Sequence, residues 1–161
     1  MRRSTFLKIA VLSLGLLALA WAPAARAVAA SSVGGVTFGE WNLPSFGSGF
    51  ATGALLDQNN NTVFKMKAKL TETPSPALAL RQGNLNGELD DGAPGFPIFF
   101  VNGSWKALAL TGEGSFEAII SKQVSPLGPI VQIGKMAGKF SDPPSFPDQV
   151  GKYKGEWKAQ L

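Results

Sequence analysis

Gly83-Asn-Leu-Asn-Gly87-Glu-Leu89 is one of three segments with a common pattern; the others are Gly134-Lys-Met-Ala-Gly138-Lys-Phe140 and Gly151-Lys-Tyr-Lys-Gly155-Glu-Trp157. Each reads glycine, any residue, apolar, any residue, glycine, any residue, apolar. Alternate residues of a β-strand point to the same side of a sheet. As strands, these segments would therefore have glycines and large apolar side chains on one face, and Asn, Lys and Glu on the other.

A helical interpretation has to be considered as well, because Gly-x-x-x-Gly is also the spacing at which membrane helices pack closely. Such helices need about 20 consecutive apolar residues, whereas these segments are short and rich in lysine. A glycine inside a helix also destabilises it by roughly 1 kcal/mol relative to alanine. The period of two residues therefore favours strands.

The N-terminus has the composition of an export signal. A basic start, an apolar stretch and a small-residue cleavage site follow one another: Arg2, Arg3 and Lys8, then residues 9–21, then Ala25-Arg26-Ala27. We expect residues 1–27 to be a signal peptide and residues 28–161 to be a single β-barrel domain. The expected location is periplasmic or extracellular.

All of the excess positive charge lies in this predicted signal. The chain has 15 basic and 11 acidic residues, and four of the basic ones precede residue 28, so 11 basic residues balance 11 acidic ones in the rest. We therefore expect no nucleic-acid binding. The lysines gather in strand-like segments, where they either protect strand edges from aggregation or attract an anionic surface such as lipid head groups or an acidic polysaccharide.

Residues 28–161 are enough for one domain that buries about two thirds of its unfolded surface. The chain has no cysteine, so an exported domain of this size has to be held together by its core and its sheet hydrogen bonds. Its 19 glycines and 11 prolines come at short intervals. This spacing is typical of many strands joined by turns.

Eight segments have the alternation of strands, and no segment after the signal has a helical period. They are residues 35–41, 49–55, 62–71, 80–90, 104–111, 114–120, 130–140 and 150–161. Asp57 to Asn61 is expected to form a hairpin turn, and a shift of apolar parity between Ile133 and Gly134 predicts a β-bulge. The apolar run Phe96 to Val101 is expected to be either a buried strand or a sticky edge available for self-association.

Eight sequential strands joined by short turns suit an antiparallel meander, and eight strands close into a small barrel. The predicted fold is all-β, a single antiparallel up-and-down β-barrel of about eight strands, with a two-sheet β-sandwich as the alternative. A third arrangement reverses the faces. In a small outer-membrane barrel, Tyr153 and Trp157 would face lipid while Lys152 and Lys154 faced the lumen.

Two residue types that commonly take part in catalysis, histidine and cysteine, are absent from the sequence. Their absence removes the commonest proton shuttle, the thiol nucleophile and the common zinc sites. Asp90 and Asp91 precede a glycine and are expected to form a turn, with weak calcium binding as the alternative. We therefore expect no catalytic residues, no metal site and no cofactor, with an isomerase-like barrel enzyme as a further alternative.

Large aromatic side chains are the remaining candidates for a binding site, because most share the predicted inner face. In a hollow barrel they would line a pocket for an apolar small molecule or lipid, whereas in a filled barrel they would be core. The candidate ligand-binding residues are Trp41, Phe64, Trp105, Phe116, Phe140, Phe146, Tyr153 and Trp157. The sequence thus predicts an exported, non-catalytic binding barrel, with a structural or surface-interaction protein as the alternative.

Overall fold

The structure, a computed structural model, describes residues 31–43, 47–75, 77, 79–141 and 150–161, and only the main chain of Ser141. Eight β-strands make up most of these residues, and the described residues form no helix. The strands are β1 (Ser32–Asn42), β2 (Ser48–Asp57), β3 (Thr62–Thr73), β4 (Leu80–Asp90), β5 (Ile98–Leu108), β6 (Gly114–Gln123), β7 (Ile130–Ser141) and β8 (Gly151–Gln160).

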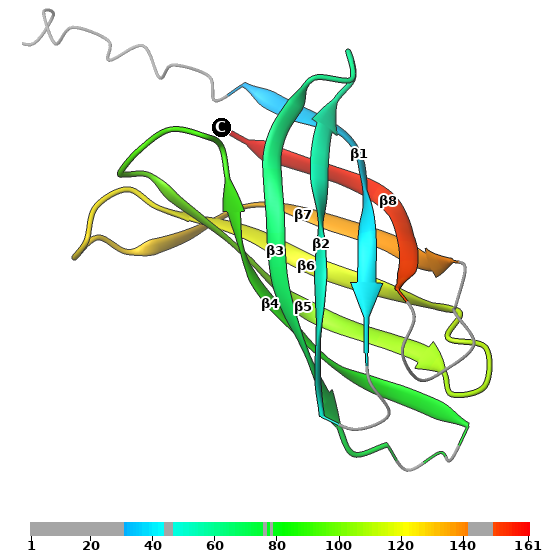
Figure 1. Cartoon of the computed structure of the whole chain (residues 1–161). Coiled ribbons are helices and arrows are strands. Elements are labelled where there is room, and N and C mark those ends of the chain that lie inside the picture. The colour runs from blue at the N-terminus through cyan, green and yellow to red at the C-terminus, as the bar shows by residue number, and fades with distance from the viewer. Residues whose placement is uncertain (1–30, 44–46, 76, 78, 142–149) are drawn as a thin grey trace, which may run out of the picture.

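Each strand pairs antiparallel with the next one along the chain, and β8 pairs with β1, so that the sheet closes into a barrel (Figure 1). The closing pair is long, since it extends from Ser32 opposite Gln160 to Trp41 opposite Gly151. Closure pairs the wall strands on both sides and so removes the free edges through which sheets aggregate. The predicted up-and-down barrel is confirmed, and the two-sheet sandwich is not formed.

The two faces of the sheet carry the side chains that the alternation predicts. Inward side chains are apolar and buried, and β3, β7 and β8 have lysines at outward positions. On β8, Tyr153 and Trp157 are buried, whereas Lys152 and Lys154 are exposed. The reversed assignment of faces, which an outer-membrane barrel would need, is therefore wrong.

Inward glycines let strands pass closely beneath large rings. A Cβ atom on Gly39 would lie 2.8 Å from Cε1 of Tyr153, and one on Gly53 would overlap the hydroxyl oxygen of the same residue. A Cβ atom on Gly138 would lie 2.6 Å from Cζ of Phe116. No side chain fits at such distances, so glycine is needed where a ring covers the strand. The small-and-large alternation is therefore a packing pattern of the barrel wall.

Two β-bulges interrupt the pairing of the wall. Opposite Ile120 and Ser121 of β6, Ile133 of β7 is an extra residue without a partner. This is the bulge predicted from the change of parity between Ile133 and Gly134. A second bulge, which the sequence did not predict, leaves Val63 of β3 without a partner on β2. Bulges increase local twist, which helps a sheet to curve and close.

The apolar run Phe96 to Val101 belongs mainly to β5. This strand begins at Ile98 and ends at Leu108, so the strand predicted at residues 104–111 in fact begins and ends earlier. Residues 99–101 pair with β4 on one side and with β6 on the other. Their main chain therefore offers no free edge, and self-association through this run stays a prediction.

The hairpin turn predicted between β2 and β3 is confirmed. The carboxylate of Asp57 accepts hydrogen bonds from the main-chain N–H groups of Asn59 and Asn61, both at 2.8 Å, and Asn60 has a φ of 64°. The Asn61 side chain, and then the main-chain N–H groups, lower the pKa of Asp57 below its ordinary value. The turn thus satisfies its own polar groups.

The predicted signal peptide at residues 1–27 and the candidate residue Phe146 both lie outside the described ranges. The signal peptide and the predicted export therefore stay predictions. Within the described ranges, no helix is long and apolar enough to cross a membrane.

Candidate functional site

Seven of the eight aromatic side chains predicted to bind a ligand lie inside the barrel, and none of these is more than 4% exposed. They are Trp41, Phe64, Trp105, Phe116, Phe140, Tyr153 and Trp157. The barrel therefore brings residues from six strands together on its inner face. Whether they bind a ligand depends on how closely they pack.

One group of rings is continuous from β1 to β8. The ring centroids of Trp41 and Phe140 are 4.9 Å apart, those of Phe140 and Phe116 are 5.6 Å apart, and those of Phe116 and Tyr153 are 5.5 Å apart. Distances of this size are typical of packed aromatic pairs. We call these four rings the first ring cluster. Each ring contacts the next in the order Trp41, Phe140, Phe116 and Tyr153.

A second ring cluster is formed by Phe64, Phe99 and Trp157. Phe64 lies 4.8 Å from Phe99 and 5.9 Å from Trp157 between ring centroids. Phe99 was not among the predicted site residues, although it shares its parity with the buried Val101. The apolar run around Phe99 lacks alternation, and this obscured its inward position.

The indole N–H groups of the interior are already bonded. Trp41 donates to the main-chain carbonyl of Lys152 at 3.2 Å, Trp105 to that of Asn84 at 3.2 Å, and Trp157 to that of Leu56 at 2.7 Å. Each bond joins a side chain to the main chain of the barrel wall. These donors therefore stabilise the barrel and are not directed toward an empty space.

Among the described residues, two hydroxyl groups of the interior are buried without a hydrogen-bond partner, those of Thr37 and Tyr153. Burial raises the pKa of Tyr153 to about 12, and the neighbouring Thr37 hydroxyl lowers it to a smaller extent. The pair is a polar defect in an otherwise apolar core.

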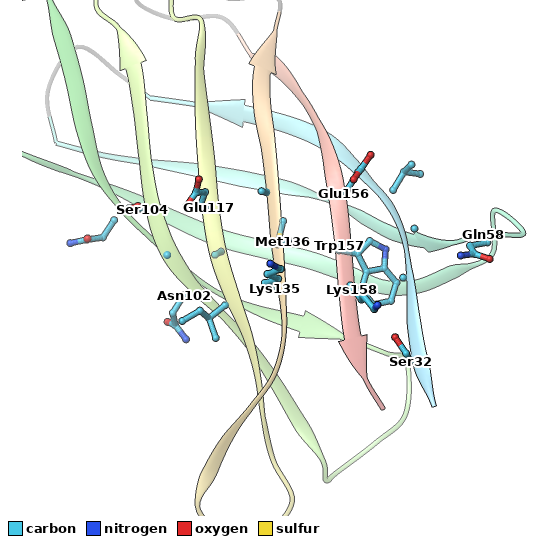
Figure 2. Close-up of a pocket in the computed structure, with 18 residues that line it drawn as sticks. Ser32, Gln58, Asn102, Ser104, Glu117, Lys135, Met136, Glu156, Trp157 and Lys158 are labelled. Carbon is cyan, nitrogen blue, oxygen red and sulfur yellow. The ribbon is translucent and has the colours of Figure 1, made fainter. Parts of the chain in front are cut away.

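A large surface hollow lies on the outer face of the barrel. It is an open groove of about 1270 Å³ that crosses β5, β6, β7, β8 and β1 (Figure 2). Its middle follows a row of directly opposed outward residues, which are Ser104, Glu117, Ala137, Glu156 and Val36. Short side chains such as Ser104 and Ala137 leave space between the longer ones.

The next row of the groove carries positive charge. Lys135 of β7 lies directly opposite Lys158 of β8, and Ile119 of β6 lies opposite Lys135 on the other side. A smaller hollow of about 390 Å³ shares Asn84, Ser104 and Glu117 with the groove and continues it toward β3 and β4. The outer face therefore offers an elongated polar surface.

Outward lysines on β3 lie opposite acidic residues of β4. Lys65 faces Asp90, and Lys67 faces Glu88. Near the β3–β4 connection, Arg81 and Glu72 form an ion pair at 2.8 Å, and hydrogen bonding from Arg81 lowers the pKa of Glu72. Positive charge on this side of the barrel is therefore matched by negative charge on the neighbouring strand.

Outward lysines on β7 and β8 lie opposite one another. Lys135 faces Lys158 and Lys139 faces Lys154, and the two strands together hold five lysines and one glutamate. Ser115 separates Lys139 from Lys106 of β5 in the same row. We call Lys106, Lys135, Lys139, Lys154 and Lys158 the lysine face. The sequence shows that these lysines point outward, but not which of them face each other.

No group of three His, Cys, Asp or Glu residues within the described ranges is placed to hold a metal ion. Asp90 accepts a hydrogen bond from the N–H of Gly92 at 2.8 Å, and Asp91 one from the N–H of Ala93 at 3.0 Å. Both carboxylates therefore act in the turn that follows β4, as their sequence context predicts.

Comparison of the chain with protein-family models, with curated protein sequences and with solved structures found no match.

Proposed function

We propose that this protein is a non-catalytic surface-interaction protein that binds arrays of anionic groups through its lysine face. The observation that carries the proposal is the pairing of Lys135 with Lys158 and of Lys139 with Lys154 across β7 and β8. Phosphate or carboxylate groups repeated along a polymer, or spread over a surface, have the complementary charge.

Facing lysines are unfavourable in the isolated protein. Directly opposed side chains on neighbouring strands have Cβ atoms about 5 Å apart, and like charges there destabilise a sheet by an amount on the order of 0.2–1 kcal/mol per pair. Protection of a strand edge does not explain these lysines, because β7 and β8 pair with each other along the closed wall. A partner that brings negative charge would remove the repulsion.

Two carboxylates lie among these lysines. Glu156 follows Lys154 at the next outward position of β8, and Glu117 lies across Ala137 in the same row. They reduce the repulsion without balancing it, since the lysine face has five positive charges. The remaining charge is concentrated on one side of the barrel, whereas two of the three lysines of β3 are matched by acids.

A ligand inside the barrel is the competing function. Ligand pockets usually have volumes of about 300 Å³ or more, and an apolar molecule of that size would have to separate rings whose centroids are 4.8–5.9 Å apart. The indole N–H groups that would orient such a ligand are bonded to the main chain. Both observations favour a filled core and an outer binding surface.

The test compares two double variants of equal charge. Lys139→Gln/Lys154→Gln removes one facing pair, and Lys67→Gln/Lys69→Gln removes the same charge from β3. Because each phosphate contact contributes to binding and to its salt dependence, we expect the first variant to elute from an immobilised polyphosphate column at clearly lower salt than the wild type. The second variant should elute close to the wild type.

If both variants elute at equally lowered salt concentrations, net charge alone governs retention on the column, and the proposal is overturned. Native mass spectrometry of protein purified from its own host tests the competing function. A co-purifying apolar molecule, lost on unfolding, would favour a ligand inside the barrel.

A further inference from the structure

The connection between β6 and β7 presents apolar side chains to solvent. Leu127 is fully exposed, and Val124, Ile130 and Val131 are each about half exposed or more. We call these four residues the apolar tip. Monomeric proteins seldom leave such groups of apolar side chains uncovered unless they meet a partner or a membrane.

The turn that carries Leu127 is held by its own hydrogen bonds. The side-chain amide of Gln123 donates to the carbonyl oxygens of Pro126 at 3.3 Å and Gly128 at 3.1 Å, and the N–H of Gly128 donates to the carbonyl of Ser125 at 3.0 Å. The exposed leucine is therefore presented by an ordered turn. Its exposure does not depend on a loose loop.

The apolar tip extends beyond the barrel wall. Pairing of β7 with β8 begins only at Gly134, so residues 130–132 pair with β6 alone. In Figure 1 the β6–β7 hairpin, in yellow and gold, reaches past the neighbouring strands at the left. Phe96, which is 40% exposed, precedes β5 next to this hairpin, because Ile98 pairs with Gln123.

Positive charge adjoins the apolar tip. Lys122 lies directly opposite Val131, and further along β7 Lys135 faces Lys158 of the lysine face. A surface that combines exposed apolar side chains with flanking lysines has the features of a membrane-surface binder. The apolar part enters the boundary between head groups and acyl chains, while the lysines meet anionic head groups.

We infer that the partner of the lysine face is an anionic lipid bilayer, into which the apolar tip inserts. This inference rests on the proposed function and names its partner. A polysaccharide chain would satisfy the lysines and leave Leu127 and Ile130 in water. A second copy of the chain, joined tip to tip, would bring lysines against lysines.

The first experiment measures sedimentation with mixed phosphatidylcholine–phosphatidylglycerol vesicles, using protein purified from its own host. Leu127→Ser/Ile130→Ser should weaken vesicle binding by about tenfold or more, because two inserted apolar side chains are lost. The control is Leu110→Ser in the connection between β5 and β6, at the opposite end of the barrel, where Leu110 is 93% exposed. The control should bind like the wild type.

The second experiment measures insertion directly. Because the chain has no cysteine, Leu127→Cys and Leu110→Cys each allow a polarity-sensitive dye to be attached at one site. We expect a blue shift of dye emission at position 127 on addition of the anionic vesicles and none at position 110. Pure phosphatidylcholine vesicles should give weaker binding, since each lysine near an anionic bilayer contributes about fivefold.

The outcomes separate the two proposals. If Leu127→Ser/Ile130→Ser binds vesicles as well as the wild type, the bilayer inference is overturned, and the polyphosphate experiment still decides the proposed function. If vesicle binding is the same with and without phosphatidylglycerol, the lysine face has no part in it and the inference is likewise overturned. A dimer of the wild type that this variant dissociates, without any change in vesicle binding, would assign the apolar tip to self-association.

Discussion

Single residues of the interior show how tightly this barrel is built. Gly39 and Gly53 leave room for the ring of Tyr153, and even so its hydroxyl group is buried without a partner. A buried polar group without a hydrogen bond is destabilising. The tyrosine therefore contributes mainly through its ring.

Replacing Tyr153 by phenylalanine should leave the free energy of unfolding at neutral pH unchanged or raise it by up to about 1 kcal/mol, because an unsatisfied hydroxyl is removed. The pH dependence should change more. Burial raises the pKa of Tyr153 from 10.0 to about 12, so above pH 10 the unfolded chain loses this proton while the folded chain keeps it. The stability that this group contributes is complete below pH 10 and is lost as the pH rises through 12.

Chemical denaturation at a series of pH values checks this prediction. The wild type should lose about 2 kcal/mol more than Tyr153→Phe between pH 10 and 12. Titration of the lysines affects both proteins alike and cancels in the comparison. Parallel curves for the two proteins over this range would contradict the prediction.

At the scale of elements, β3 and β7 use the same residue type in different surroundings. Both strands place lysines outward, but Lys65 and Lys67 of β3 face acidic residues of β4, while the lysines of β7 face lysines of β8. The same substitution should therefore have opposite effects on the two strands.

Lys139→Glu should raise the free energy of unfolding by about 0.5 kcal/mol at low salt, because it places a carboxylate opposite Lys154. Lys67→Glu should lower it by a similar amount, because it places a carboxylate opposite Glu88. Thermal denaturation at low and high salt measures both effects, and salt should reduce them. If the two variants change stability in the same direction, the facing of the lysines is not the cause of the effect.

The whole molecule combines an interior of closely spaced aromatic rings with an uneven distribution of charge outside. The two ring clusters lie in the buried core, and the chain has no disulfide to support it. Packing and hydrogen bonding of the closed sheet therefore supply the stability.

Trp157→Ala should lower the free energy of unfolding by about 4 kcal/mol, because it removes a buried ring that contacts Phe64 and a hydrogen bond to the carbonyl of Leu56. The effect of the milder Trp157→Phe should be smaller. Denaturant unfolding followed by circular dichroism gives both values. A stable Trp157→Ala that instead loses an apolar ligand would show that Trp157 lines a binding cavity.

Much of the fold could be predicted because most of these strands are regular. In a regular strand the side chains alternate between the two faces with a period of two residues. The parity of Gly134 to Phe140 and of Gly151 to Trp157 assigns each side chain to one face, and a break in parity located the bulge at Ile133. The start of β5 was predicted wrongly, because Phe96 to Val101 is apolar at successive positions. Such a run lacks the alternation from which a strand is recognised.

The sequence by itself determined the strands and which side chains share a face, because alternation is a local property of the strand. Closure of the sheet into a barrel, with the apolar face inward, was decided by the tertiary structure. Only the tertiary structure decided that the inward rings touch one another, since contact depends on how the closed sheet curves. It also decided that Lys135 and Lys139 face Lys158 and Lys154. Register depends on turns and bulges along the whole strand pair, and a shift of one residue would give every lysine a different partner.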